Sequence, residues 1–252
     1  MTTAQQTTQP AAADQTQPSP EARILAIDIG GTGLKAAILN VDGEMITERL
    51  RVVTPHPCTP DELVNALVKL VEPLTGFDYV SAGFPGVVRH GKIITAPNLG
   101  TDMLKGFDLA AAVEERLGKP VRVINDADMQ GYGAIEGKGL EMVITLGTGF
   151  GSALFMDGQI APHLEIAHLP FRKDKTYDQQ IGDKARKKVG KKPWNRRVKR
   201  AIDTLRVLTN FDRLYVGGGN AKKINFKLDS DVKTISNECG VRGGAWLWRK
   251  RD

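Results

Sequence analysis

The chain has 252 residues, of which 41% are hydrophobic and 25% charged, a composition typical of a globular protein with its own core. No apolar stretch approaches the roughly 20 residues that a transmembrane helix needs, so no membrane partner is predicted. The formal net charge is +6, and the two cysteines, Cys58 and Cys239, fit neither a disulfide framework nor a metal-binding spacing, so a cytoplasmic protein is expected.

The first 22 residues contain no lysine, no arginine and no aliphatic run. Secretory and organellar targeting peptides need basic and apolar stretches, so neither is predicted here. Thr, Gln, Ala and Pro dominate this segment, which therefore cannot bury enough apolar surface to fold. We expect a disordered tail over 1–22, an N-terminal lobe over 23–126 and a C-terminal lobe over 127–252. The last helix either stays with the second lobe or packs back on the first.

Strand and helix patterns alternate along the folded part. In the first half, the patterns predict strands at 23–29, 34–41 and 45–54, a helix at 59–74, a strand running into a loop at 79–86 and a short helix at 109–118. In the second half, they predict a strand that turns into a helix over 120–137, a glycine-turned hairpin over 140–160, two helices in a basic segment, a strand at 213–219 and a short terminal helix. Strands that alternate with helices predict an α/β fold.

Both halves contain a strand, a glycine-rich turn and a second strand, at 24–41 and at 142–156. Glycines let backbone N–H groups crowd round an anion without interference from side chains. For either hairpin alone, glycines that only make the turn are an equally good explanation. Two hairpins at matching positions favour phosphate-binding turns on opposite walls of a cleft. The candidate phosphate-binding residues are Gly30, Gly31, Thr32, Gly33 and Lys35 in the first hairpin and Thr145, Gly147, Thr148 and Gly149 in the second.

Asp28 ends the first strand, directly before these glycines. A carboxylate so close to a phosphate would be repelled unless a cation lies between them. Mg²⁺ prefers oxygen ligands and is commonly held by one or two carboxylates together with phosphates. We therefore expect Asp28 to bind Mg²⁺, directly or through a water molecule.

Four motifs in this order are more specific than any one alone: "DIGGTGLKAAIL", "NDADMQGYG", "TLGTGFGSA" and "VGGGNAK". They resemble the ROK family of sugar kinases in the actin/hexokinase superfamily, and within it the polyphosphate-dependent glucokinases. The resemblance extends from Arg23 to the C-terminus. It implies a two-lobed actin-like ATPase/hexokinase (ribonuclease H-like) fold with a cleft between the lobes. The implied reaction is phosphorylation of the 6-hydroxyl of glucose or a related hexose, with Mg²⁺ and with polyphosphate, ATP or both as donor.

The resemblance also implies roles for single residues. Asp126 matches the general base, which accepts the proton of the sugar hydroxyl as the phosphoryl group is transferred. A helix N-cap is the structural alternative for Asp126, and Asp128 is expected to be a first-turn helix charge. The implied sugar contacts are Asn98, Asn125, Asp126, Glu165 and His168, with Pro85 and Gly86 of the "GFPG" loop. The implied donor contacts in "GGGN" are Gly218, Gly219 and Asn220.

Many members of the family bind a structural zinc through the histidine at the position of His168 and a nearby cysteine cluster. Neither cysteine lies between residues 58 and 239, so no zinc is expected. Two positions depart from the family pattern: Ala167 replaces a glycine, and Pro170 stands where related kinases often have another sugar-binding carboxylate. Both bear on sugar affinity.

The basic segment from Arg172 to Arg200 contains thirteen Lys and Arg residues and three acidic ones, a formal charge of +10, so the rest of the chain carries −4. Three interpretations fit it: a solvated helix face, a nucleic-acid site with Trp194 as a stacking residue, or a track for a long phosphate chain. The kinase motifs favour the track over nucleic acid. Its candidate residues are Lys187, Lys188, Lys191 and Lys192.

The sequence leaves alternative functions open. One is a strictly ATP-dependent ROK glucokinase or hexokinase, and another is a non-catalytic ROK-type sugar-binding regulator. Such regulators carry an N-terminal helix-turn-helix domain, for which a polar 22-residue tail is too short. A nucleic-acid-binding module leaves Asp28 and Asp126 unexplained, so no nucleic acid is expected as a partner. A homodimer is compatible with the kinase interpretation.

Overall fold

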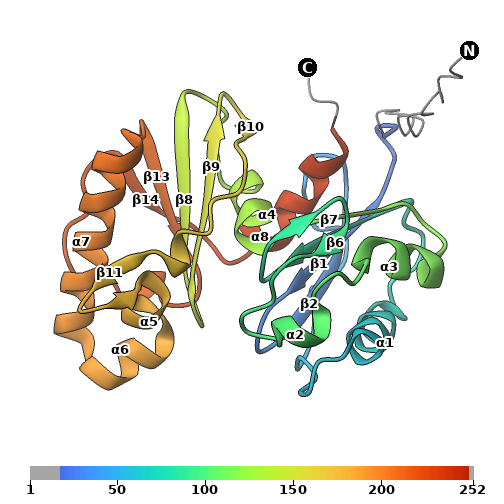
Figure 1. The fold of residues 1–252 in the computed structure, drawn as a ribbon. Helices are drawn as coiled ribbons and strands as arrows, with labels where there is room; N and C mark the ends of the chain where they lie inside the picture. The colour runs from blue at the N-terminus through green and yellow to red at the C-terminus, as the bar shows by residue number, and fades with distance from the viewer. Residues whose placement is uncertain (1–17, 250–252) are drawn as a thin grey trace, which may run out of the picture.

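The computed structural model describes residues 18–249, so most of the predicted tail, residues 1–17, lies outside the described residues. Two five-stranded sheets lie side by side with helices around and between them (Figure 1). In spatial order, the first sheet consists of β3 (Leu50–Val52), β2 (Leu34–Leu39), β1 (Ile24–Ile29), β4 (Tyr79–Phe84) and β7 (Val121–Asn125). The second consists of β10 (Gln159–Ile160), β9 (Phe150–Met156), β8 (Leu140–Leu146), β13 (Arg213–Gly217) and β14 (Val232–Thr234).

The two sheets share one topology. In the first, β1 pairs antiparallel with β2 and parallel with β4, which pairs parallel with β7. In the second, β8 pairs antiparallel with β9 and parallel with β13, which pairs parallel with β14. Each glycine-rich turn therefore lies at the corresponding end of its own sheet. The α/β class predicted from the sequence is confirmed.

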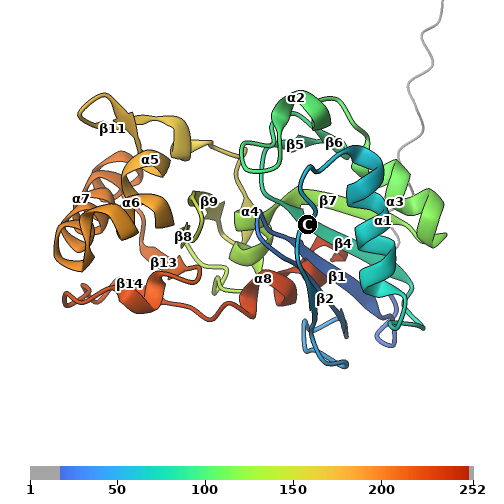
Figure 2. The same ribbon diagram turned by 90° about the horizontal axis from the view of Figure 1, so that it is seen from below.

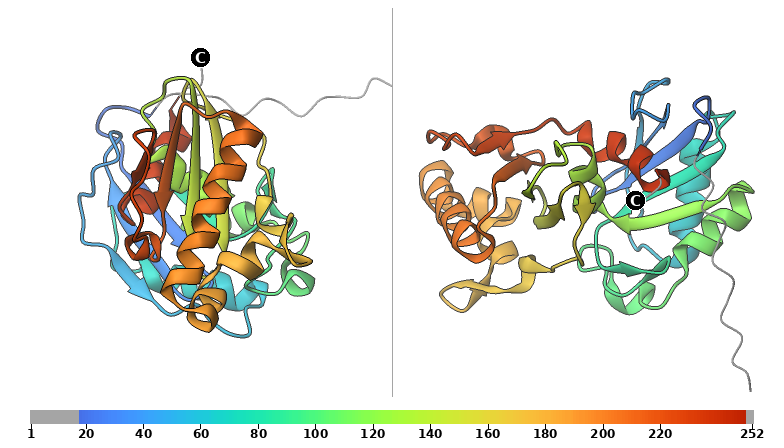
Figure 3. Two further views of the ribbon diagram at one scale, coloured as in Figure 1. Left: turned by 90° about the vertical axis from the view of Figure 1, so that its left-hand side faces the viewer. Right: turned by 90° about the horizontal axis from the view of Figure 1, so that it is seen from above.

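Helices form three layers around the sheets (Figures 2 and 3). Those against the outer face of the first sheet are α1 (Pro60–Val71) and α3 (Leu109–Leu117), with the short α2 (Thr101–Leu104) nearby. Those against the outer face of the second are α5 (Tyr177–Ile181), α6 (Asp183–Val189) and α7 (Lys191–Thr209). Between the sheets lie α4 (Asp126–Tyr132), α8 (Cys239–Arg242) and the 3-10 helix η3 (Gly243–Trp248). Each layer has its own apolar core. No helix within residues 18–249 combines the length and the apolar character needed to cross a bilayer.

Local sequence explains the outer helices. Thr59 and Glu62 form a capping box at the start of α1, which buries Leu63 and Leu67 against the first sheet. Gly118 ends α3 in the left-handed conformation, with φ 64°. The helices predicted at 59–74 and 109–118 are therefore confirmed, with the first ending earlier, at Val71.

Other elements differ from the sequence prediction. The strand expected over 45–54 is only three residues long, and Met45 makes a single bridge to Leu39. Its β-branched residues Ile46 and Val53 are 51% and 80% exposed, so they gain nothing from pairing at this sheet edge. The basic segment forms three helices instead of two. The short strands that the pattern did not predict are β5 (Val88–Arg89), β6 (Lys92–Ile93), β11 (Pro170–Arg172), β12 (Lys175–Thr176) and β14. The remaining 3-10 turns are η1 (Ile166–His168) and η2 (Ala221–Lys223).

The terminal segment returns to the first sheet. The Ser81 hydroxyl on β4 donates to the Gly244 carbonyl at 2.7 Å, and the Trp248 indole donates to the same hydroxyl at 2.9 Å. At Gly243, where α8 is followed by η3, the chain approaches α4 so closely that an added methyl group would overlap the carbonyl oxygen of Met129. The layer between the sheets therefore depends on a glycine at this crossing.

We expect Gly243→Ala to lower the free energy of unfolding by about 1–3 kcal/mol, because the methyl group would have to push the start of η3 away from α4. Denaturant unfolding measures the change. Gly219→Ala is the matched control, since its added methyl group would meet no atom within 4 Å. Equal stability of the two variants would contradict the close packing at Gly243.

Candidate active site

A cavity of about 590 Å³ lies between the two lobes, at the end where both glycine-rich turns meet. Of the residues that the sequence predicts for the site, the four lysines of the proposed polyphosphate track do not line this cavity. All the others, which are predicted to bind metal, phosphate or sugar, do line it. The lining residues among those predictions are Asp28, Gly30, Gly31, Thr32, Gly33, Lys35, Pro85, Gly86, Asn98, Asn125, Asp126, Thr145, Gly147, Thr148, Gly149, Glu165, His168, Gly218, Gly219 and Asn220.

The two turns face each other across Asn98. A methyl group added at Gly31 would lie 3.1 Å from the Asn98 Cβ, and one added at Gly149 would lie 3.8 Å from its Nδ2. Within residues 18–249, the N–H groups of Thr32 and Thr148 donate to no acceptor. Unpartnered amides at a glycine-rich turn are suited to anions.

Neighbouring groups hold each turn in place. The Thr54 hydroxyl donates to the Gly30 carbonyl at 2.6 Å, and the Phe150 N–H donates to Asp178 Oδ1 at 2.9 Å. The Asn220 amide donates to the Gly147 carbonyl at 3.2 Å. Gly218 has φ +83°, and a side chain there would overlap the carbonyl of the second turn. The "GGGN" loop therefore supports the second turn as well as lining the cavity.

Asp28 and Lys35, which the sequence predicts as a metal ligand and a phosphate ligand, contact each other. Lys35 Nζ donates to Asp28 Oδ2 at 2.6 Å, and the carboxylate is 17% exposed. No cluster of three or more acidic, His or Cys side chains within residues 18–249 could hold a metal alone. A divalent cation at Asp28 would therefore take most of its ligands from phosphate and water, as Mg²⁺ commonly does.

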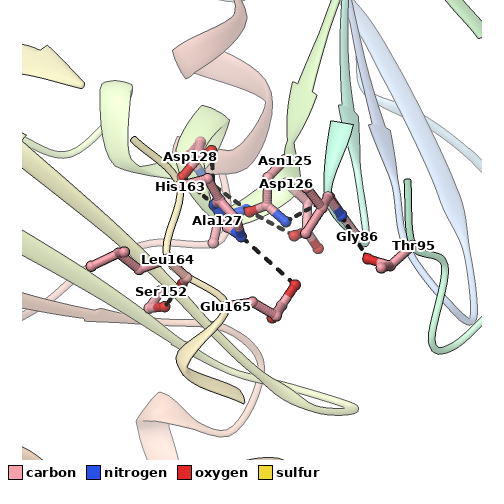
Figure 4. Close-up of polar contacts among 11 residues, drawn as sticks. Gly86, Thr95, Asn125, Asp126, Ala127, Asp128, Ser152, His163, Leu164 and Glu165 are labelled. Atoms are coloured by element: carbon pink, nitrogen blue, oxygen red, sulfur yellow. Dashed lines mark hydrogen bonds and ion pairs between the residues drawn. The ribbon is translucent and has the colours of Figure 1, made fainter. Parts of the chain in front are cut away.

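Asn125 and Asp126, at the junction of β7 and α4, have different hydrogen-bonding roles. Asn125 Oδ1 accepts from the N–H groups of Ala127 and Asp128 at 2.8 and 3.2 Å, and its Nδ2 donates to the Gly86 carbonyl at 3.1 Å (Figure 4). Asn125 is thus the N-cap, the role that the sequence offered as the alternative for Asp126. Within residues 18–249, the Asp126 carboxylate accepts one backbone hydrogen bond, from the Ala127 N–H at 2.8 Å.

The surroundings of Asp126 favour its protonated form. Burial is the largest cause, followed by the charge of Asp28, and together with Asp128 and Glu165 they raise the pKa of Asp126 to about 7. The Ala127 hydrogen bond opposes this shift. A carboxyl group with a pKa near neutrality can accept and release a proton at physiological pH.

A histidine that the sequence analysis missed links two of these acids. His163 Nδ1 lies 3.0 Å from Asp128 Oδ2, and its Nε2 lies 3.7 Å from Glu165 Oε2 (Figure 4). Asp128, expected to be a first-turn helix charge, lies in that turn but is only 5% exposed. The burial of Asp128 follows from the second sheet packing on α4, which the local sequence does not reveal. His168, by contrast, is exposed and lines the cavity.

Further lining residues carry charge or polar groups that the sequence analysis did not single out. They are Arg51, Gln130, Asp178, Asp183 and Asn237. Arg51 pairs with Lys35 across the β2–β3 ladder, so hairpin register could have found it. Ala167, one of the two departures, lines the cavity, whereas Pro170 begins β11 outside it.

The four lysines of the proposed track lie on α6 and at the start of α7, and all are exposed. Lys187 Nζ contacts Asp183 Oδ2 at 2.7 Å, and Asp183 lines the cavity. Hydrogen bonds from Lys187 and Arg186 hold the pKa of Asp183 at about 2. The basic segment therefore reaches the edge of the cavity at Asp183.

Comparison with known proteins gives consistent matches. The model of the ROK family matches residues 24–168. The polyphosphate glucokinase of Mycobacterium tuberculosis is 30% identical over 224 residues, which cover 85% of this chain and 83% of that protein. The crystal structure of an inorganic polyphosphate/ATP-glucomannokinase from Arthrobacter sp. strain KM has a TM-score of 0.83 at 31% identity, covering 90% of this chain and 98% of that chain.

A third match concerns the fold alone. A ROK family glucokinase from Streptomyces griseus, solved in complex with glucose and AMPPNP, has a TM-score of 0.76 at 19% identity and covers 90% of this chain and 99% of that one. With the two sheets of shared topology, these matches confirm the predicted two-lobed fold of actin-like ATPases and hexokinases.

The pKa of Asp126 predicts a pH-dependent effect on stability. An unfolded Asp has a pKa of about 3.9, so between about pH 4 and pH 7 only the folded state holds the extra proton. Stability from this group is full below pH 4 and is lost as the pH rises through 7. We therefore expect the Tm of Asp126→Asn, relative to wild type, to increase from pH 4 to pH 8. Calorimetry across this range measures the difference, and a difference independent of pH would contradict the raised pKa.

Proposed function

The chain belongs to the ROK family, and we propose that it is a hexokinase-type phosphotransferase that phosphorylates the 6-hydroxyl of glucose or a related hexose. The observation that carries the proposal is Asp126, which lines the same cavity as the two glycine-rich turns and has a pKa of about 7. The free thiols Cys58 and Cys239 fit a reducing cytoplasm as its location.

Asp126 acts as the general base in this proposal. A sugar hydroxyl is a poor nucleophile, so a carboxylate within hydrogen-bond reach accepts its proton as the phosphoryl group leaves the donor. Asn125 holds Asp126 in place from the end of β7 and the start of α4. Asn98, Glu165 and His168 supply polar groups for the sugar hydroxyls.

The two turns hold the donor phosphates. The free N–H groups at Thr32 and Thr148 provide neutral donors for phosphate oxygens, and Lys35 adds a positive charge. Asp28 would hold Mg²⁺, which neutralises charge on the phosphates when it is bound. Lys35 would then contact a phosphate in place of Asp28.

Polyphosphate is the donor that we propose, with ATP as a second donor. The Mycobacterium tuberculosis and Arthrobacter relatives, which match most of the chain at 30% and 31% identity, are both named for polyphosphate, and the second also for ATP. A long polyphosphate chain would extend beyond the cavity of about 590 Å³. The exposed lysines of α6 and α7 begin at Asp183, where such a chain would leave the cavity.

The proposal is tested with purified protein, glucose and Mg²⁺, offered polyphosphate or ATP separately, with glucose 6-phosphate measured. We expect kcat/KM to rise with pH through an inflection near 7, because Asp126 must be deprotonated to act. Asp126→Asn should fold and lose turnover by about 10²–10⁴, the usual contribution of a general base. A folded variant with more than about a hundredth of wild-type turnover would remove Asp126 from this role.

The donor is tested by replacing Lys187, Lys188, Lys191 and Lys192 together with Gln. Holding a polyphosphate chain resembles holding a nucleic-acid backbone, so it depends on the number of cations and on salt. We expect KM for polyphosphate to rise much more than KM for ATP, and added salt to act in the same direction.

A variant with the same loss of charge elsewhere is the control. Lys69, Lys92, Lys105 and Lys138 are exposed and do not line the cavity. Their replacement by Gln should leave the ratio of the two donor activities unchanged. If the two quadruple variants behave alike, the basic segment is a solvated face.

A further inference from the structure

His163 lies at the centre of a row of three ionisable groups. Its Nδ1 faces both carboxylate oxygens of Asp128, at 3.0 and 3.1 Å, and its Nε2 points toward Glu165 (Figure 4). Asp128 is 5% exposed and has no other cationic partner within residues 18–249. Glu165 is the member of the row that lines the cavity.

The backbone next to Glu165 is held by a hydrogen bond, whereas the Glu165 side chain is not. The backbone before it is fixed, because the Ser152 hydroxyl of β9 donates to the Leu164 carbonyl at 2.9 Å. The Glu165 carboxylate has no hydrogen bond within the described residues, and His163 Nε2 is buried without one. At 3.7 Å, a small movement of the Glu165 side chain would close this contact.

We propose that His163 is a positioning residue, which bridges the buried carboxylate of Asp128 to Glu165 and so orients Glu165 toward the bound sugar. The groups that face it are Asp128 on α4 and Glu165 on the segment before η1. Burial lowers the pKa of His163, but its contacts with both acids outweigh this and raise it to about 10. The imidazole is therefore a cation at neutral pH, with one N–H for each carboxylate. The effect on the sugar rests on the proposed function, whereas the bridge itself does not.

His163→Asn separates positioning from a structural role. The Asn amide reaches the place of Nδ1 and can donate to Asp128, but nothing replaces Nε2. If His163 only satisfies Asp128, the variant should behave like wild type. If it orients Glu165, KM for glucose should rise about tenfold, a loss typical of one hydrogen bond to a charged group. The change in kcat should be smaller, because Asp126 is untouched.

A double-mutant cycle with Glu165→Gln identifies the partner. We expect His163→Asn to raise KM in the wild-type background and to add little in the Glu165→Gln background. A wild-type KM for His163→Asn, or an equal increase in both backgrounds, would overturn the proposal. His90→Asn is the matched control, because His90 is exposed and its φ of 50° is one that Asn tolerates.

The imidazole itself can be observed without any activity. The chain has four histidines, and ¹⁵N NMR should show one that stays doubly protonated at pH 8. That signal should be absent in His163→Asn, present in His90→Asn, and should titrate at lower pH in Glu165→Gln. If wild type phosphorylates no hexose with either donor, the proposed function fails and this measurement still decides the bridge. A His163 signal that titrates near pH 6.5 in both backgrounds would overturn it.

Discussion

The junction between β7 and α4 positions Asn125 and Asp126 at the cavity. There the chain leaves the first sheet and enters the layer between the sheets, where α4 packs against β4, β8, β9 and α8. The Asn125 side chain caps the start of α4 and also donates a hydrogen bond to the Gly86 carbonyl. Asp126 therefore begins a helix that packs against both sheets, in a place where water is partly excluded. The burial that raises its pKa is a direct result of how the lobes are joined.

The acids in and beside the cavity differ in their cationic partners. Asp28 has Lys35 as its cationic neighbour, and Asp128 and Glu165 share His163. Within residues 18–249, Asp126 has no such neighbour and only the Ala127 N–H as a hydrogen-bond donor. Burial without a cationic partner raises the pKa of Asp126 to about 7, a value suited to the base role proposed for it.

The sequence predicted what is repeated or locally encoded, and it missed what depends on packing between the lobes. The two hairpins, the junction at Asn125-Asp126 and the capped helix α1 follow from local patterns, and the structure contains them. The division of roles between Asn125 and Asp126 does not, since either residue type can cap a helix. His163 was missed because its significance comes from Asp128, 35 residues away in sequence and buried only by the second lobe. The prediction of a strand over 45–54 was too long for a related reason. The β-branched residues of this segment favour a strand, but most of the segment has no neighbouring surface to pack against.

The charges are arranged unevenly along the cavity. The acids Asp126 and Glu165 lie with the proposed sugar contacts, whereas the first turn combines neutral amides with the Asp28–Lys35 ion pair and the second turn is bound to Asp178. Asp183 adds a negative charge at the edge, where its pKa of about 2 keeps it ionised, and Lys187 and Arg186 are bound to it. Lys188, Lys191 and Lys192 do not line the cavity, so a donor confined to the turns would leave them unused. Under the proposed function, only a donor that continues past Asp183 would reach those cations, so we propose that the length of the donor determines whether the basic segment contributes to binding.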